Sequence, residues 1–169
     1  MNPVSFAKWA TDPVRTVEEK YGALLLIEAT AHQVYWKRYQ IVLEVEFYRG
    51  PIPRKQRSGD PGYIPHIEYE YAQWTEDYLP ELTVLFLGRY DDRPLRDVSF
   101  LQFCPAIEHL ELTQTDILDF DPVASLTSLK KLNISGTEAS DFTFLGRIGT
   151  LESLNLMLFH PWPDFAGLE

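Results

Sequence analysis

A leucine pattern with a nearly constant period dominates the second half of the chain and restricts what it can fold into. The unit reads L-x-x-L-x-L and first occurs at Leu82, Leu85 and Leu87. It returns after 25 residues and then twice after 22, as Ile107-Leu110-Leu112, Leu129-Leu132-Ile134 and Leu151-Leu154-Leu156. The last two apolar positions of each unit alternate as on a short strand, so they point to one side. One unit cannot bury such a face alone, so we expect the four units to stack on one another.

A second motif recurs between the leucine units. Asp97, Asp119 and Asp141 stand 22 residues apart, each followed by Val or Phe. An aspartate at such a position typically caps free N–H groups, so we expect a 3₁₀ or short helical return to begin there. The apolar residue after each aspartate would then pack inward.

Together the two motifs resemble the leucine-rich repeat family, in its 22-residue class, over residues 82–156. The resemblance implies an α/β fold, in which a solenoid carries a parallel sheet whose concave face binds proteins or peptides. Thr115 and Thr137 replace the Asn or Cys usual after the strand, so the buried turn would have to use threonine hydroxyls. We expect residues 1–80 to form a capping segment packed on the repeats of residues 81–169, with a short C-terminal cap, as one compact unit.

The first 80 residues carry helix and strand patterns instead of this repeat. Asp12-Pro13 predicts a helix start, because Asp caps a helix and Pro suits its first turn. The helix would cover residues 14–21 and end at Gly22. Residues 23–29 are apolar but too few for periodicity to decide between helix and strand.

Two further segments alternate apolar and acidic side chains, which predicts strands at residues 39–48 and 67–71. We expect these strands to extend the sheet of the solenoid. The fold class is therefore a leucine-rich repeat solenoid with a parallel sheet, capped by an N-terminal helix and extra strands. Between the two strands, residues 49–65 form a long basic loop.

Charge and composition narrow the range of partners. The 169 residues include 25 acidic and 15 basic ones, for a formal charge of −10. Such a surface repels phosphate, so we expect a basic protein partner and no nucleic acid. The longest apolar run, residues 23–27, is too short to cross a bilayer, and the N-terminus lacks a secretory signal. We therefore expect no membrane association and a cytoplasmic location, with which a single cysteine agrees.

Motifs for catalysis or cofactor binding are missing from the sequence. The four histidines, His32, His66, His109 and His160, have no metal-binding spacing. Neither a phosphate-binding glycine loop nor a nucleophile elbow occurs, and Cys104 has the setting of a buried structural thiol. We expect no enzyme, no metal and no cofactor. An active site that combines His32 or His66 with a glutamate stays open as an alternative.

If the N-terminal strands join the sheet, acidic side chains gather on its open face around Phe86. Like charges on neighbouring strands destabilise a sheet, so such a cluster would serve to attract a basic partner, although a merely solvated face is equally compatible with the pattern. The full set of predicted partner-binding residues is Glu44, Glu46, His66, Glu68, Glu70, Phe86, His109, Glu111, Lys131, Asn133 and Asn155.

These features predict a protein-binding module. A narrower hypothesis is a small bacterial immunity protein that neutralises a basic, nuclease-like toxin by presenting carboxylates to its phosphate-binding cleft. The alternative is an adaptor or scaffold repeat protein with no toxin partner.

Overall fold

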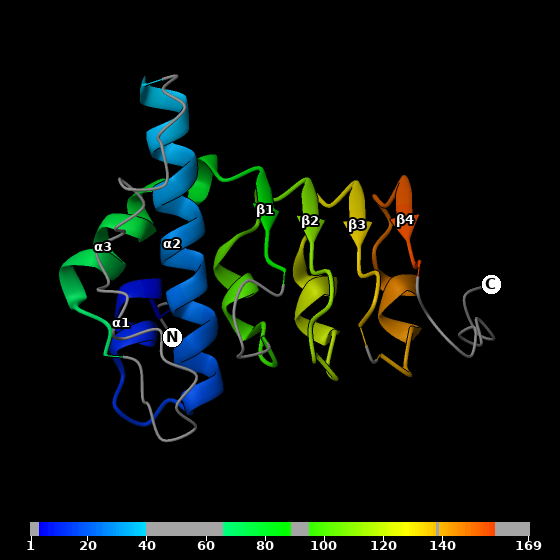
Figure 1. Cartoon of the computed structure of the whole chain (residues 1–169), viewed down its shortest axis with the longest axis horizontal. Coiled ribbons are helices and arrows are strands. Elements are labelled where there is room, and N and C mark those ends of the chain that lie inside the picture. The colour runs from blue at the N-terminus through cyan, green and yellow to red at the C-terminus, as the bar shows by residue number, and fades with distance from the viewer. Residues whose placement is uncertain (1–3, 40–65, 89–94, 138, 158–169) are drawn as a thin grey trace.

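The structure, a computed structural model, describes residues 4–39, 66–88, 95–137 and 139–157. Figure 1 shows helices gathered at one end of the molecule and a row of short strands leading away from them. The helices are α1 (Phe6–Thr11), α2 (Val17–Tyr39) and α3 (Tyr69–Tyr78), and the strands are β1 (Val84–Phe86), β2 (His109–Glu111), β3 (Lys131–Asn133) and β4 (Ser153–Asn155). Short 3₁₀ helices complete the described part: η3 (Leu79–Glu81), η4 (Ser99–Phe103), η5 (Asp121–Ser125) and η6 (Thr143–Arg147).

The four strands form one parallel sheet in chain order, β1-β2-β3-β4. Equivalent leucines pair across it, since Leu85 lies opposite Leu110, Leu110 opposite Leu132 and Leu132 opposite Leu154. Leu85, Leu110 and Leu132 are buried. A 3₁₀ helix lies between each strand and the next. This is a leucine-rich repeat solenoid, as the period of the leucines predicts.

The return segments confirm the role expected of the repeated aspartates. The Oδ1 atoms of Asp97, Asp119 and Asp141 accept hydrogen bonds from the backbone N–H two residues later, at 2.8–3.0 Å. A 3₁₀ helix begins at that N–H in all three repeats. Phe120 and Phe142, which follow two of the aspartates, are buried as expected.

The threonines that replace the usual turn residue are both buried and bonded. The hydroxyl of Thr115 donates to the carbonyl of Leu112 at 3.2 Å, and that of Thr137 donates to the carbonyl of Ile134 at 3.0 Å. Each hydroxyl thus satisfies a carbonyl three residues earlier in its own repeat. Bonds between repeats come from other groups, such as the Thr150 hydroxyl, which donates to the Leu129 carbonyl at 2.7 Å.

The first helix boundary differs from the prediction. Asp12 ends α1, and its Oδ1 atom accepts a bond from the N–H of Val14. Helix α2 begins only at Val17, where Thr16 and Glu19 form a reciprocal capping box: the Glu19 N–H donates to the Thr16 hydroxyl, and the Thr16 N–H donates to the Glu19 carboxylate. The predicted start at Asp12-Pro13 is wrong because this box satisfies the free N–H groups four residues later.

Gly22 does not end a helix. It lies inside α2, which continues through residues 23–29 and so decides the open choice there in favour of helix. A Cβ atom at Gly22 would lie 2.8 Å from both the carbonyl oxygen of Asp97 and Cδ1 of Phe100. The glycine therefore lets α2 press closely against the first return of the solenoid.

The strand predicted at residues 67–71 is also wrong, because this segment enters helix α3. Ala72, Thr75 and Leu79 are buried at helical spacing, and this longer pattern outweighs the alternation of the five residues 67–71. The α3 carboxylate of Glu76 accepts a bond of 2.9 Å from the N–H of Ala7, which fastens α1 to α3. The predicted strand at residues 39–48 and the basic loop at residues 49–65 lie outside the described residues, except for Tyr39, which ends α2.

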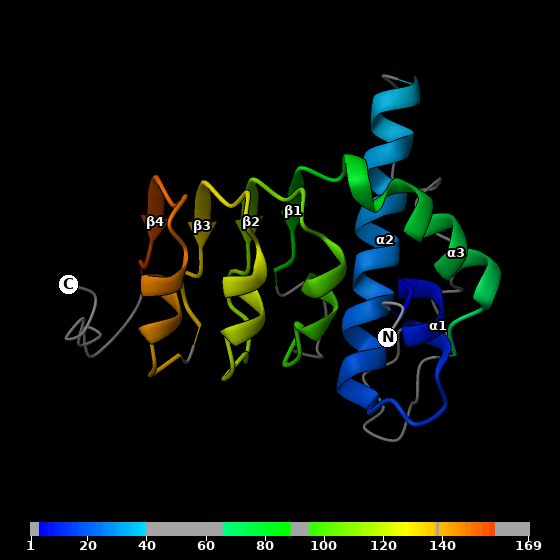
Figure 2. The ribbon, with the colours of Figure 1, turned by 180° about the vertical axis from the view of Figure 1, so that it is seen from behind.

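Helix α2, and no described strand, lies next to the edge of the sheet. Figures 1 and 2, taken from opposite sides, both show it between β1 and the other two helices. The side-chain amide of Gln33 donates to the carbonyl of Val84 and so satisfies a backbone group on this edge. The main hydrophobic core of the described residues runs from Phe6 in α1 to Ile148 beyond η6, and Tyr21 and Leu24 of α2 form a small second cluster.

Candidate functional site

The outward side of the sheet offers the most regular array of accessible side chains in the described residues. In β1, β2 and β3 the central leucine is buried and its two neighbours are more exposed. In β4, Ser153 is exposed, and Leu154 and Asn155 are half-buried. The strand register arranges these neighbours in two rows. We call them the sheet face: Val84, His109, Lys131 and Ser153 in one row, and Phe86, Glu111, Asn133 and Asn155 in the other.

Phe86 is the main apolar feature of the sheet face. Its side chain is 45% exposed, although a phenylalanine is usually buried. The ring of His109 on the next strand meets it edge-on, with centroids 5.3 Å apart and planes at 75°. The pair forms an aromatic surface at the end of the sheet that is nearer the helices.

Hydrogen-bonding groups dominate the other end of the sheet face. The Oδ1 atom of Asn133 accepts bonds from the N–H and hydroxyl of Ser135 at 3.1 and 2.6 Å. The Oδ1 atom of Asn155 accepts from the N–H of Met157 at 3.1 Å. These bonds hold both side chains in place, and no described residue is bonded to either Nδ2 group.

The sheet face carries no excess of negative charge. Glu111 is its one carboxylate and Lys131 its one ammonium group, so their formal charges cancel when His109 is neutral. The cluster of acidic side chains predicted around Phe86 therefore does not form across the described strands.

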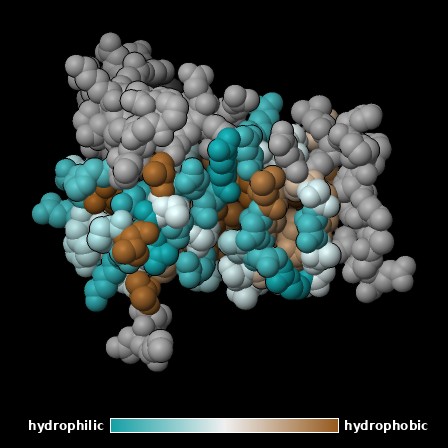
Figure 3. Space-filling view, turned by 90° about the horizontal axis from the view of Figure 1, so that it is seen from below, coloured by the Kyte–Doolittle hydropathy of each residue, from teal (hydrophilic) through white to brown (hydrophobic). Residues whose placement is uncertain are grey.

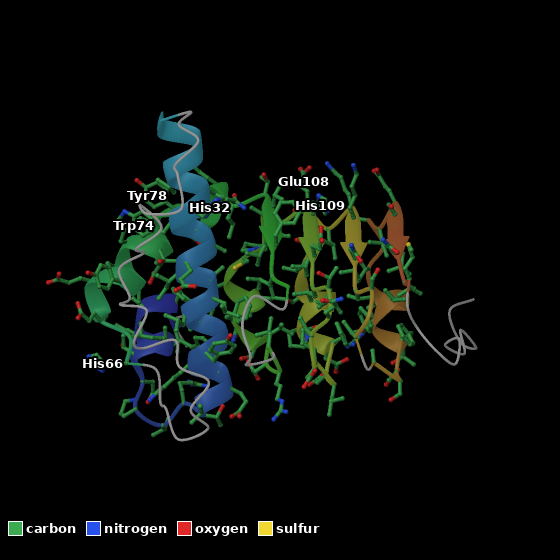
Figure 4. All side chains as sticks on the ribbon, in the orientation of Figure 1. His32, His66, Trp74, Tyr78, Glu108 and His109 are labelled. Atoms are coloured by element: carbon green, nitrogen blue, oxygen red, sulfur yellow. The ribbon has the colours of Figure 1, made fainter. Side chains whose placement is uncertain are left out.

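Two of the carboxylates predicted for the sheet lie at helix α3 instead. Glu68 is the N-cap of α3 and Glu70 is in its first turn, so the structure corrects their predicted position on the sheet. His66 precedes α3 at the helical end, away from His109 in the sheet (Figure 4). Glu44 and Glu46 lie outside the described residues. Of the predicted partner-binding set, the structure brings together Phe86, His109, Glu111, Lys131, Asn133 and Asn155.

The described part of the chain holds no cluster of side chains suited to binding a metal ion. No three His, Cys, Asp or Glu side chains there are placed to hold a metal ion. Cys104 is fully buried, and burial raises the pKa of its thiol from 9.0 to about 12. A thiol with so high a pKa is a poor nucleophile at neutral pH. None of the described helices has the length and apolar character that crossing a membrane requires.

Acidic side chains of the solenoid and of the helical end differ in their surroundings. Three ion pairs link neighbouring repeats of the solenoid: Arg96–Asp116 at 3.5 Å, Lys130–Glu108 at 3.0 Å, and Arg147–Asp121. Residues 66–88, which include α3, contain five acidic residues and no Lys or Arg. The charge of the solenoid is therefore partly compensated, whereas no described Lys or Arg forms an ion pair with a carboxylate of α3.

Exposed aromatic side chains on α3 were not predicted as a binding feature. Tyr69 is 48% and Tyr71 37% exposed, and the ring of Trp74 contacts that of Tyr78 with centroids 4.8 Å apart. The signal in the sequence was present, since Tyr71, Trp74 and Tyr78 are three and four residues apart and such residues share one helix face. Elsewhere, exposed hydrophobic groups are scattered over a mostly hydrophilic surface, as the face in Figure 3 shows.

Comparisons with known proteins found limited likeness. No protein-family model matches the chain. A protein of Arabidopsis thaliana named "Putative F-box protein At3g58910" is 37% identical over 73 residues, which are 42% of this chain and 34% of that protein. The match thus spans about a third of the relative.

Two solved structures of Listeria monocytogenes internalins match parts of the chain. An internalin (inlF) covers 68% of this chain and 37% of its own, with 18% identity and a TM-score of 0.47. Internalin C2 covers 53% of this chain and 39% of its own, with 21% identity and a TM-score of 0.39.

Proposed function

We propose that this chain is a protein-binding module and not an enzyme, and that the sheet face is the docking surface for its partner. One observation carries the proposal: Phe86 stands 45% exposed on a regular sheet, braced by His109, within a set of ordered polar side chains. Binding energy at protein interfaces is concentrated in a few such aromatic anchors, which polar groups surround.

The two ends of the sheet face support different contacts. At β1 and β2, Val84, Phe86 and His109 offer an apolar and aromatic surface. At β3 and β4, Asn133 and Asn155 are already held by their own backbone bonds. Side chains that are ordered before binding lose less conformational entropy when a partner arrives.

A matched pair of variants tests this proposal. The whole chain, in its wild-type form and as Phe86→Ala and Leu118→Ala, is immobilised and used to capture proteins from the native cell extract. Leu118 is 73% exposed in the return between β2 and η5, so it controls for loss of an exposed apolar side chain elsewhere. The proposal predicts a protein retained by wild type and Leu118→Ala but lost with Phe86→Ala.

Affinity measurements on the captured protein complete the test. Removal of a central aromatic anchor costs about 2 kcal/mol or more of binding free energy, so Phe86→Ala should weaken binding at least about 30-fold. Leu118→Ala should leave it within about twofold. Equal binding by all three chains would refute a role of the sheet face.

A narrower proposal concerns the partner's identity. The formal charge of −10 supports a basic partner, and an immunity protein acting in the cytoplasm on a basic, nuclease-like toxin is one such case. Of the carboxylates predicted to bind the partner, those in the described residues are Glu111 on the sheet, Glu68 at the N-cap of α3 and Glu70 in α3. Reversal of these three charges should abolish protection when the chain is produced together with its cognate toxin. Undiminished protection would favour the alternative, an adaptor or scaffold repeat protein.

A further inference from the structure

Helix α3 presents a second surface whose chemistry differs from that of the sheet face. Its buried side, Ala72, Thr75 and Leu79, faces the core. Its other side carries Tyr71, Trp74 and Tyr78 at helical spacing of three and four residues. Figure 4 places Trp74 and Tyr78 at the helical end of the molecule, away from His109 in the sheet.

Carboxylates border these aromatic rings. Glu70 and Asp77 are exposed on α3, seven residues apart, and Trp74 is four residues from one and three from the other. Such spacings bring side chains onto neighbouring parts of one helix face. Glu68 and Glu81 are exposed at the two ends of the same segment. We call Glu70, Tyr71, Trp74, Asp77, Tyr78 and Glu81 the α3 face.

No cation of the described residues compensates this face. None of its carboxylates takes part in an ion pair with another described residue, in contrast to Glu108, Asp116 and Asp121 of the solenoid. Arg15, a basic residue near α1, is already held by Glu19 at 2.9 Å and lies over the Trp9 ring at 5.3 Å. Among the described residues, the carboxylates of the α3 face therefore have no basic partner.

We propose that the α3 face docks an arginine-bearing basic segment of a protein partner. Carboxylates attract a guanidinium group and can bind it through two parallel hydrogen bonds. Exposed aromatic rings bind the same group through their faces, and tyrosine and tryptophan do so better than phenylalanine. A surface with both features selects arginine over an apolar segment, which the carboxylates would reject, and over an acidic one, which they would repel.

The α3 face is a second docking surface, so its binding of arginine can be disproved without affecting the function proposed for the sheet face. A direct probe is an eight-residue peptide of alternating Arg and Ala, with an alternating Glu and Ala peptide as the opposite case. Each is titrated into the whole chain, and affinity is measured by calorimetry at low and physiological salt. Backbone amide and tryptophan indole signals in nuclear magnetic resonance spectra locate the site.

Two triple variants with the same change in net charge separate a local site from general attraction. Glu70→Gln with Asp77→Asn and Glu81→Gln neutralises the α3 face, while Glu18→Gln with Glu108→Gln and Glu152→Gln neutralises residues outside both the α3 face and the sheet face. The α3 triple should weaken binding of the Arg peptide about tenfold, since each exposed charge contributes modestly. The control triple should keep binding within about twofold, and the Glu peptide should not bind.

The single variant Tyr71→Leu tests the aromatic part, because leucine keeps an apolar side chain but removes the ring. This variant should weaken binding of the Arg peptide several-fold. If circular dichroism shows that the α3 triple variant does not fold, the Tyr71→Leu result alone tests the proposal. Shifts in the signals of residues 69–81 and of the Trp74 indole would locate the peptide on the α3 face. Equal losses in both triples, shifts confined to the sheet, or absence of binding would each overturn the proposal.

Discussion

At the scale of single residues, several side chains have roles that their type alone does not indicate. Gly22 is a contact residue inside a helix. Cys104 is a core thiol whose raised pKa reflects burial. Asn133 and Asn155 were predicted to bind a partner, and their side-chain oxygens also close the turns that follow their strands. Each of these roles depends on which atoms lie nearby.

Gly22→Ala should destabilise the protein even though alanine favours a helix over glycine by about 1 kcal/mol. The new Cβ atom would lie 2.8 Å from the Asp97 carbonyl oxygen and from the Phe100 ring, so α2 must move away from the solenoid. We expect the free energy of unfolding, measured with urea, to fall by about 1–3 kcal/mol. Gly149→Ala is the control, because no atom lies within 4 Å of its added Cβ; a larger loss there than at Gly22 would contradict the packing argument.

At the scale of elements, local hydrogen bonds set where helices and returns begin. The Thr16–Glu19 capping box opens α2, and the three spaced aspartates open η4, η5 and η6. Each of these bonds joins residues two or three positions apart, so the sequence carries the signal for it. Where two such signals compete, the one that satisfies more backbone groups determines the helix start. Asp12-Pro13 was a plausible helix start, but Thr16-x-x-Glu19 satisfies one more backbone group.

Glu19→Gln should reduce the dependence of stability on pH. Burial tends to raise the pKa of the Glu19 carboxyl, but hydrogen bonds from Thr16 and Arg15 and the charge of Arg15 outweigh it and hold the pKa below its ordinary value of 4.5. A lowered pKa means that the carboxylate stabilises the fold above about pH 4.5, and that this contribution is lost as pH falls through the folded-state value.

Urea unfolding at pH 7 and pH 3 measures this effect. We expect wild type to exceed Glu19→Gln in stability at pH 7 and the difference to shrink at pH 3. Glu18→Gln, one residue earlier in α2 and without such bonds to the described residues, is the control. A difference of the same size at both pH values would show that the Glu19 charge is not responsible.

At the scale of the whole molecule, one core joins the helical end to the solenoid. Phe6 and Trp9 of α1 pack on Phe103 of η4, with ring centroids 5.6 and 5.4 Å apart. The helices cover the first repeat, and each repeat covers the next. The two proposed binding surfaces, the sheet face and the α3 face, thus stand on one continuous support.

This continuity predicts that damage in the middle of the solenoid also unfolds the helices. Leu110 is fully buried in β2, and Leu110→Ala should lower the free energy of unfolding by about 2–5 kcal/mol. Circular dichroism and tryptophan fluorescence should then report one shared transition, since Trp9 and Trp74 lie in the helices. Separate transitions, with fluorescence unchanged from wild type, would mean that the helices fold independently. Leu118→Ala, on the surface, should change stability by less than about 0.5 kcal/mol.

The repeat region was predictable because its pattern is local and recurs. A fixed spacing of leucines determines a strand, a return and the next strand, and each unit then meets a copy of itself. The fold class, the inward leucines, the capping aspartates and the outward residues Phe86, His109, Glu111, Lys131, Asn133 and Asn155 all follow from that register. The two rows of the sheet face could thus be read from the sequence alone.

The structure of the N-terminal helical end was not predictable from the sequence pattern, because it depends on tertiary contacts. Residues 67–71 alternate like a strand but lead into helix α3, whose buried residues face α1 and the core. Glu68 and Glu70 therefore do not lie on the sheet, and the predicted acidic cluster does not form there. Gly22 fits a helix end by type, but it lies where two elements approach within contact distance. In the solenoid every neighbour is another copy of the same pattern, whereas a cap meets partners distant in the chain, and their shape decides what its residues do.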